Sequence, residues 1–312
     1  MKIFILYILT GLIVSAAVMI PFAGGVSSFL VFVTTADMLF VVCLWALGFA
    51  VTSFVFGIIT KDYSWVDRLW SILPVGFAWY YAYRSGCALA PCVAAGLITV
   101  WGIRLTFNFS RKGGYNGIED YRWSYLRTKI TNPVLWQIFN LFFISFFQTG
   151  LFVLFTYPVY SLTLYSSNSS SLPVLFWVFS VLGIALVCYE FACDQQQWNF
   201  HGAKKAAKEN RNYPEKFSSD VKNGFLSHGF FALSRHPAYF GELGFWWTIW
   251  LAAFSLTWNP VSSGLFGPVL LTIIIVGSTF LAETISSSKY PEYKNYQKKV
   301  LSIIIPWFPK KG

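Results

Sequence analysis

Two polar clusters beside long apolar stretches hold the side chains best suited to chemistry. Glu190 and Asp194 lie four residues apart, so both carboxylates share one face of a helix, and Gln196 continues the polar run. An ionisable residue at membrane depth is costly and is therefore a candidate for function. The alternative is a helix end that emerges into water, where these carboxylates pair with basic loop residues.

The other cluster reads Leu-Ser-Arg-His-Pro-Ala-Tyr-Phe-Gly-Glu-Leu over residues 233–243. Pro237 is suited to the first turn of a helix, and the free N–H groups of a helix start favour phosphate. Arg235 can bind phosphate with two donors, and His236 can add another. The pattern predicts an anion-binding site at the start of a helix.

The end of this cluster adds two further candidates. Gly241 has no side chain and would let a ligand approach the backbone closely. Glu242 lies one turn into an apolar helix, where a carboxyl can serve as a functional acid. A salt bridge between Glu242 and Arg235 is the alternative interpretation.

A glycine-rich basic segment follows the apolar stretch that ends near residue 105. Arg111 and Lys112 can reach an anion, and the three glycines of residues 113–117 permit tight turns. The aromatic residues of 121–125 are typical of a segment at the membrane interface.

Tyrosines recur at spacing three near the C-terminal end. Tyr290, Tyr293 and Tyr296 form one aromatic stripe on a short helix, directly after Lys289. This helix either lies on the membrane surface or covers the cytosolic mouth of a site and stacks on a ring.

The composition predicts the class of fold that holds these clusters. The chain has 312 residues, of which 56% are hydrophobic, 20% aromatic and 12% charged, against roughly 25% charged in an average soluble domain. A soluble fold and a disordered chain are both excluded, which leaves an all-α, multi-pass membrane bundle of seven to eight helices. Eight spans are predicted, at about 3–21, 38–60, 65–83, 88–105, 134–160, 172–193, 239–256 and 264–282.

The distribution of charge predicts the orientation. Of the 23 Lys and Arg residues, 19 lie in segments 104–133, 194–235 and 283–312, which the predicted spans place on one side. The positive-inside rule makes that side cytosolic, together with the C-terminus. We therefore expect an integral membrane protein, in the endoplasmic reticulum if eukaryotic and in the inner membrane if bacterial.

Several site classes have no support in the sequence. The five cysteines and three histidines show no metal-ligand spacing, so no metal is expected. There is no Walker loop and no GxGxxG motif. The net charge of +10 is spread over three loops beside a membrane, so no nucleic-acid partner is expected, and no obligate protein partner is evident.

The motifs together resemble the uncharacterised membrane branch of the steroid 5-alpha-reductase superfamily. The resemblance runs from about Asp67 to Pro309, so it divides the chain into N-terminal spans at 1–60 and a reductase-like domain at 61–312. The matching stretches are Asp67-Arg-Leu-Trp-Ser71, Arg104-Leu, Arg111-Lys-Gly-Gly-Tyr115, Glu119-Asp-Tyr-Arg-Trp123, Asp194-Gln-Gln, Ser234-Arg-His-Pro-Ala-Tyr-Phe-Gly-Glu242, Lys289-Tyr-Pro-Glu-Tyr293 and Ile305-Pro-Trp307.

This resemblance implies a membrane oxidoreductase that uses NADPH to reduce an activated C=C bond of a sterol-like or other lipid. It implies cofactor contacts at the adenine end, at the phosphates, near the nicotinamide and at the mouth of the site. The residues implied at the adenine end are Asp194 and Gln196, and those implied at the phosphates are Arg111, Lys112, Arg235 and His236. Tyr239 and Glu242 are implied near the nicotinamide. Lys289, Tyr290 and Tyr293 are implied at the mouth of the site.

The substrate end departs from the characterised steroid reductases, which use a Glu and a Tyr in two early spans. Asp67 is the acid nearest to the Glu position, and Trp101-Gly102 stands where the Tyr should fall. Asp67 and Glu242 are thus the candidate catalytic acids.

Two other functions remain open. An S-adenosylmethionine-dependent membrane methyltransferase, of the isoprenylcysteine carboxyl methyltransferase type, carries a similar Arg-His-Pro motif. The second alternative is a non-catalytic membrane scaffold that kept the fold and lost the activity.

Overall fold

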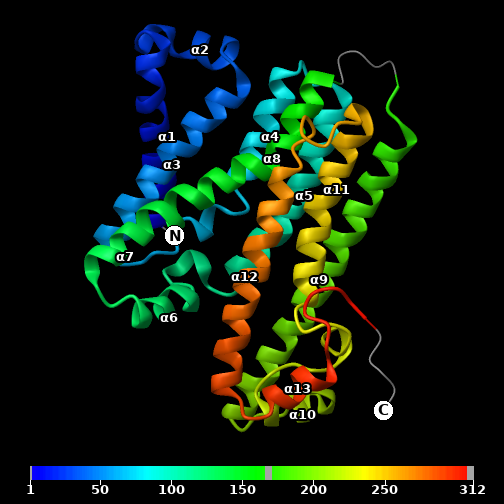
Figure 1. Ribbon diagram of the computed structural model, residues 1–312. Coiled ribbons are helices and arrows are strands. Elements are labelled where there is room, and N and C mark those ends of the chain that lie inside the picture. The colour runs from blue at the N-terminus through cyan, green and yellow to red at the C-terminus, as the bar shows by residue number, and fades with distance from the viewer. Residues whose placement is uncertain (1, 166–170, 308–312) are drawn as a thin grey trace. The chain divides into compact units, whose positions relative to one another are not determined.

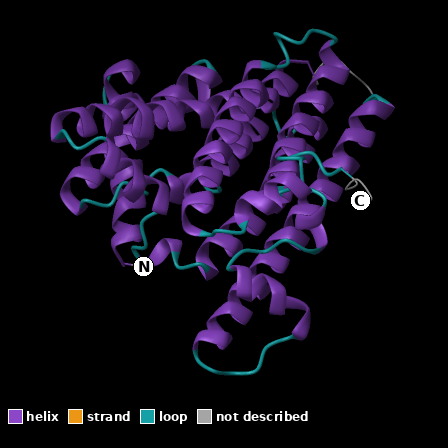
Figure 2. Cartoon of the chain, turned by 60° about the horizontal axis from the view of Figure 1, so that its bottom comes forward, coloured by secondary structure: helices purple, strands orange, loops and turns teal. Residues whose placement is uncertain are grey.

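A computed structural model of the chain describes residues 2–165 and 171–307, which form helices and no strands (Figures 1 and 2). Residues 308 and 309 of the resemblance lie outside this described part. The chain divides into two compact units, Met1–Ser180 with Ile249–Leu270, and Val181–Thr248 with Leu271–Gly312. This division differs from the boundary at residue 60 that the resemblance implies.

The first unit is built from the N-terminal helices. Asp37 starts one of them, because its carboxylate accepts a hydrogen bond of 2.8 Å from the Phe40 N–H. Asn132 and Pro133 start another in the same way. The helices are α1 (Lys2–Ala23), α2 (Phe29–Thr35), α3 (Met38–Thr60), α4 (Leu73–Arg84), α5 (Leu89–Arg111), α6 (Tyr121–Lys129), α7 (Pro133–Phe139), the π-helical segment Asn140–Phe147 and α8 (Gln148–Tyr165).

The second unit contains residues 181–208 of α9 (Val174–Lys208), residues 237–248 of α11 (Pro237–Thr257) and residues 271–289 of α12 (Phe266–Lys289). The long connection between α9 and α11 contains the short helices Glu215–Phe217, α10 (Ser218–Asn223) and Gly229–Ala232. The helix α13 (Tyr293–Lys299) follows α12. As predicted from Pro237, the motif that contains Arg235 lies at the start of a helix.

Six helices of the described residues are long and apolar enough to cross a membrane, which confirms a multi-pass helical membrane protein. They correspond to six of the eight predicted spans. Their bounds are Lys2–Ala23, Met38–Thr60, Leu89–Arg111, Pro133–Tyr165, Val174–Lys208 and Phe266–Lys289.

The other two predicted spans differ from expectation. Residues 65–83 begin with a polar turn and continue as α4, whose 12 residues extend about 18 Å, well short of a hydrocarbon core of about 30 Å. Residues 239–256 form α11, which has the necessary 21 residues. It carries Glu242 and three tryptophans and is not one of the six.

Candidate functional site

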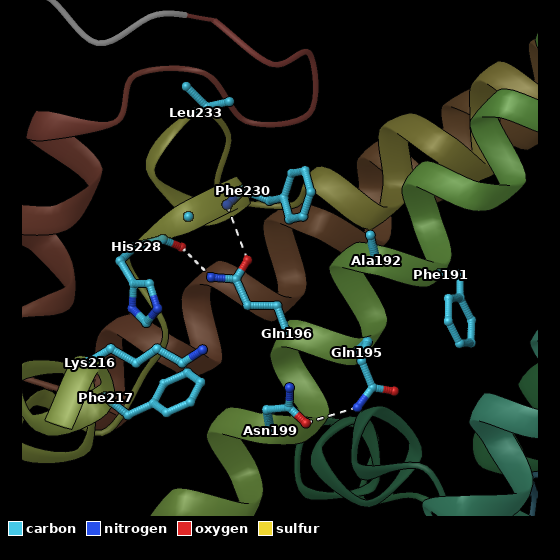
Figure 3. Close-up of a pocket in the computed structure, with 11 residues that line it drawn as sticks. Phe191, Ala192, Gln195, Gln196, Asn199, Lys216, Phe217, His228, Phe230 and Leu233 are labelled. Carbon is cyan, nitrogen blue, oxygen red and sulfur yellow. Dashed lines mark hydrogen bonds between the residues drawn. The ribbon is translucent and has the colours of Figure 1, made fainter. Parts of the chain in front are cut away.

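The second unit contains a cavity of about 680 Å³, a volume typical of ligand pockets. Residues of α9 and of the connection between α9 and α11 line it (Figure 3). The lining residues are Phe191, Ala192, Gln195, Gln196, Asn199, Lys216, Phe217, His228, Gly229, Phe230 and Leu233.

Side-chain amides form the α9 side of the cavity. The amide of Gln196 donates to the carbonyl of His228 at 2.9 Å and accepts from the N–H of Phe230 at 3.1 Å. The Gln195 amide donates to Asn199 at 2.8 Å. Gln196 therefore ties the loop at 228–230 to α9, and this contact explains Gly229, where an added Cβ would collide with the Gln196 amide.

A carboxylate–imidazole pair lies at the loop side. Asp220 is only 2% exposed, and its Oδ1 accepts from the N–H of Ser227 at 2.9 Å and from the Ser227 hydroxyl at 2.7 Å. Its Oδ2 is hydrogen-bonded to Nδ1 of His228. The imidazole is therefore fixed in orientation by a buried carboxylate.

Arg235, predicted to bind phosphate, is enclosed by the chain itself. Its Nε and Nη2 donate to the two carboxylate oxygens of Glu283, the latter at 3.1 Å. Its Nη1 donates to the carbonyls of Val300 and Leu301. The guanidinium thus binds the C-terminal segment. The alternative interpretation, a salt bridge between Arg235 and Glu242, is wrong, because the partner of Arg235 is Glu283. We call this set, Arg235 and Glu283 with the backbone of residues 300–304, the tail clasp.

His236 and Tyr239 belong to the same contact. The N–H of His236 donates to the carbonyl of Ile303 at 2.9 Å, so this helix-start donor is not available to an anion. The imidazole lies 3.3 Å from Glu283 and stacks on the Tyr239 ring, with 5.5 Å between the ring centres. The predicted anion site at the start of α11 is therefore occupied by the chain's own C-terminal segment.

Glu242 and Gly241 face α9. Glu242 is 8% exposed, and its carboxylate accepts a hydrogen bond of 3.1 Å from the indole of Trp246. A Cβ on Gly241 would lie 2.6 Å from Cβ of Glu190 and 3.0 Å from the carbonyl oxygen of Leu186. Gly241 therefore serves the close approach of α9 and α11 rather than the approach of a ligand.

The remaining predicted residues of this unit have varied surroundings. Asp194 is buried in α9, as is Glu190. The hydroxyl of Tyr290 accepts a hydrogen bond from the Lys204 ammonium at 3.2 Å. Burial acts to raise the pKa of Tyr290, but the hydrogen bond and the charge of Lys204 outweigh it, so this pKa is lowered overall. Tyr293 is a core residue, 5% exposed and packed on Phe225, so it is not placed to stack on a ligand.

The ammonium of Lys289, at the end of α12, lies 5.4 Å from the centre of the Tyr290 ring.

The predicted acid Asp67 lies in the first unit. Its carboxylate accepts a 2.6 Å hydrogen bond from the indole of Trp123. Burial, together with the negative charge of Asp120, raises the pKa of Asp67 to about 6. This carboxyl can hold a proton close to neutral pH, as a general acid must.

The neighbouring Arg68 ties two motif segments together. It is 1% exposed and donates to Asp62 at 2.6 Å and to the carbonyl of Gly114 at 2.8 Å. Its guanidinium lies over the Trp65 ring at 4.5 Å. The structure thus brings the Asp67-Arg-Leu-Trp and Gly-Gly-Tyr segments into contact.

Arg111 and Lys112 also belong to the first unit, at the end of α5. The Arg111 guanidinium donates to Asn108 at 2.9 Å and lies 5.1 Å from the Phe107 ring. Neither residue lines the cavity of the second unit.

Comparison with known sequences identifies the family of the chain. Residues 53–300 match the family described as protein of unknown function DUF1295. The chain belongs to the DUF1295 family. An uncharacterised protein of Schizosaccharomyces pombe is 34% identical over 245 residues, which cover 76% of this chain and 71% of that protein. No solved structure matches the chain.

The DUF1295 match begins at residue 53, just before the first motif of the resemblance. It includes every residue that lines the cavity, the Asp220–His228 pair and the Arg235–Glu283 ion pair. It ends at residue 300, where the tail clasp begins to use the carbonyls of the C-terminal segment.

Three residues are absent from the sequence-based predictions: Lys216 and His228, which line the cavity, and Asp220, which is hydrogen-bonded to His228. They lie in an irregular connection, where no helical or strand period indicates which side chains meet. The available signal is Gly224, which has φ +87° and reverses the chain between Asp220 and His228.

Proposed function

We propose that this protein is a membrane oxidoreductase of the steroid 5-alpha-reductase superfamily. In this proposal it uses NADPH to reduce an activated C=C bond of a sterol-like or other lipid. The observation that carries the proposal is the cavity of the second unit, which is built from the same Asp194-Gln-Gln segment that carries the resemblance.

The lining of the cavity fits the adenosine end of a dinucleotide. The amides of Gln195, Gln196 and Asn199 supply donors and acceptors of the kind that an adenine edge needs. Phenylalanine rings offer apolar faces for stacking. Lys216 is the only lysine or arginine among the described residues that line it, and it provides a cation for a phosphate.

NADPH supplies a hydride to the lipid alkene when it is bound. The chain must then provide a proton for the other carbon and a donor for the substrate carbonyl, where negative charge develops. We assign the proton to the buried carboxyl of Glu242, whose protonated form passes it to the reduced product. Asp67 is the other candidate acid for these tasks.

We place the cavity on the cytosolic side of the membrane. Lysine and arginine are concentrated in residues 194–235 and 283–312, which the positive-inside rule assigns to the cytosol. NADPH would then enter from the cytosol and the lipid from the bilayer.

A second candidate is an S-adenosylmethionine-dependent methyltransferase. The observation in its favour is that a single lysine lines the cavity, since S-adenosylmethionine carries the adenosine group without phosphates.

Turnover tests the reductase and the role of Glu242. In nanodiscs, we expect the wild-type protein to oxidise NADPH only when a lipid enone is present. Glu242→Gln keeps the shape of the side chain but removes its proton, so we expect it to lower kcat by about 100-fold or more and to leave the affinity for NADPH unchanged. Glu292→Gln, at an exposed acid of the same unit, is the matched control. Equal rates for wild type and Glu242→Gln would exclude Glu242 as the acid.

A further inference from the structure

We propose that Lys216 and His228 form a phosphate-binding subsite in the cavity and that Asp220 positions His228. The ligand group we assign to it is the 2′-phosphate on the adenosine ribose, which distinguishes NADPH from NADH. This inference rests on the proposed function, and it names residues that select the cofactor.

The first step is the fixed orientation of the imidazole. The carboxylate of Asp220 is buried, and two hydrogen bonds from Ser227 hold its Oδ1 in place. Because Oδ2 is hydrogen-bonded to Nδ1 of His228, the proton on Nδ1 is directed at this carboxylate. In the protonated imidazole, the second N–H is then the one that can bind a ligand.

The second step is the convergence of a lysine ammonium and an imidazole on one aromatic ring. The ammonium of Lys216 lies 5.3 Å from the centre of the Phe217 ring, and the imidazole of His228 lies 5.2 Å from the same centre. Both residues line the cavity, with the amides of Gln196 and Asn199 across from them on α9 (Figure 3). A small anion in the cavity can therefore meet both groups.

The third step concerns charge. None of the described residues that line the cavity is a carboxylate, and the carboxylate of Asp220 is hydrogen-bonded to His228 and Ser227. An anionic group entering the cavity therefore meets positive and neutral side chains only.

The fourth step selects a phosphate monoester over a pyrophosphate. Pyrophosphate sites commonly use the N–H groups of a helix start, but α9 lines the cavity with the interior of a helix. Among the loop N–H groups, that of Phe230 is bound by Gln196 and that of Phe217 by Pro214. Lys216 and His228 are the ionisable side chains among the described residues that line the cavity, and an ammonium with an imidazole N–H suits a single terminal phosphate.

The experiment compares two soluble probes that differ by one phosphate, adenosine 2′,5′-bisphosphate and AMP, with inorganic phosphate as a third. Binding to the purified full-length protein is measured by calorimetry for wild type, Lys216→Gln, His228→Gln and Asp220→Asn. The control is Lys222→Gln, an exposed lysine outside the cavity.

We expect wild type and the control to prefer the bisphosphate over AMP. Lys216→Gln and His228→Gln should each weaken the bisphosphate by about tenfold or more, with AMP changed by less than about twofold. Asp220→Asn should reduce the same preference and should also lower the NADPH-to-NADH affinity ratio. A residue that only supported the fold would change both probes together.

Three results would overturn the proposal and are distinguishable. If AMP binds and the preference survives in all three variants, the phosphate subsite is wrong and the adenosine cavity stands. If neither adenosine probe binds the folded wild-type protein, the subsite and the proposed cofactor site both fail. Equal binding of inorganic phosphate by wild type and all three variants would likewise exclude these residues as the subsite.

Discussion

Replacing Glu283 with glutamine is expected to lower the free energy of unfolding of the second unit by about 3 kcal/mol, since breaking a buried ion pair leaves an uncompensated charge. Arg235 and Glu283 are 8% and 7% exposed, and their two hydrogen bonds are the centre of the tail clasp. Gln297 also donates to this carboxylate at 3.0 Å.

The same substitution should loosen the C-terminal segment before the unit unfolds. The N–H groups of Arg235 and His236 donate to the carbonyls of Ser302 and Ile303, and that of Trp307 donates to Leu233. Hydrogen exchange should therefore accelerate at these three amides in Glu283→Gln. Glu292→Gln, which alters an exposed acid, should change stability by less than about 0.5 kcal/mol. Unchanged exchange and stability in Glu283→Gln would show that the clasp does not hold the tail.

Gly241→Ala is expected to force α9 and α11 apart. The new Cβ would meet Cβ of Glu190 at 2.6 Å and the carbonyl oxygen of Leu186 at 3.0 Å. Backbone and Cβ atoms cannot rotate away, so we expect a loss of about 1–3 kcal/mol in the free energy of unfolding. Displacing α9 at Glu190 also moves Gln196, less than two turns along the same helix, and should weaken ligand binding in the cavity.

The matched control is Gly202→Ala, also in α9. No atom lies within 4 Å of its added Cβ, so alanine should be neutral or stabilising by up to about 1 kcal/mol through helix propensity. Melting temperatures of the two variants measure the difference. Equal stability of both variants would contradict the close packing of α9 on α11.

Much of the fold follows from apolar length and from helix starts. Uninterrupted apolar runs predict the six long helices, and Pro237 predicts where α11 begins. Sequence failed at residues 65–83, where the apolar count suggested a span. The polar contacts of Asp67 and Arg68 hold the first residues of this stretch in a turn, and only the short α4 follows.

The site was predicted less completely, because its contacts join distant residues. Gln196 was a candidate from its place beside Asp194, and it lines the cavity. The partner of Arg235, by contrast, is 48 residues away, and no spacing rule selects Glu283 over Glu242. The Arg-His-Pro motif therefore suggested a phosphate site where the structure has the tail clasp.

The most direct test of the account is the melting temperature of the purified, detergent-solubilised full-length protein with NADPH, NADH or S-adenosylmethionine. A ligand present at 100 times its dissociation constant adds about 2.7 kcal/mol to the stability of the folded state, which is a readily measured shift. We predict a larger shift with NADPH than with NADH and none with S-adenosylmethionine. A shift with S-adenosylmethionine alone would contradict the reductase and support the methyltransferase, and no shift with any of the three would contradict an adenosine site in the cavity.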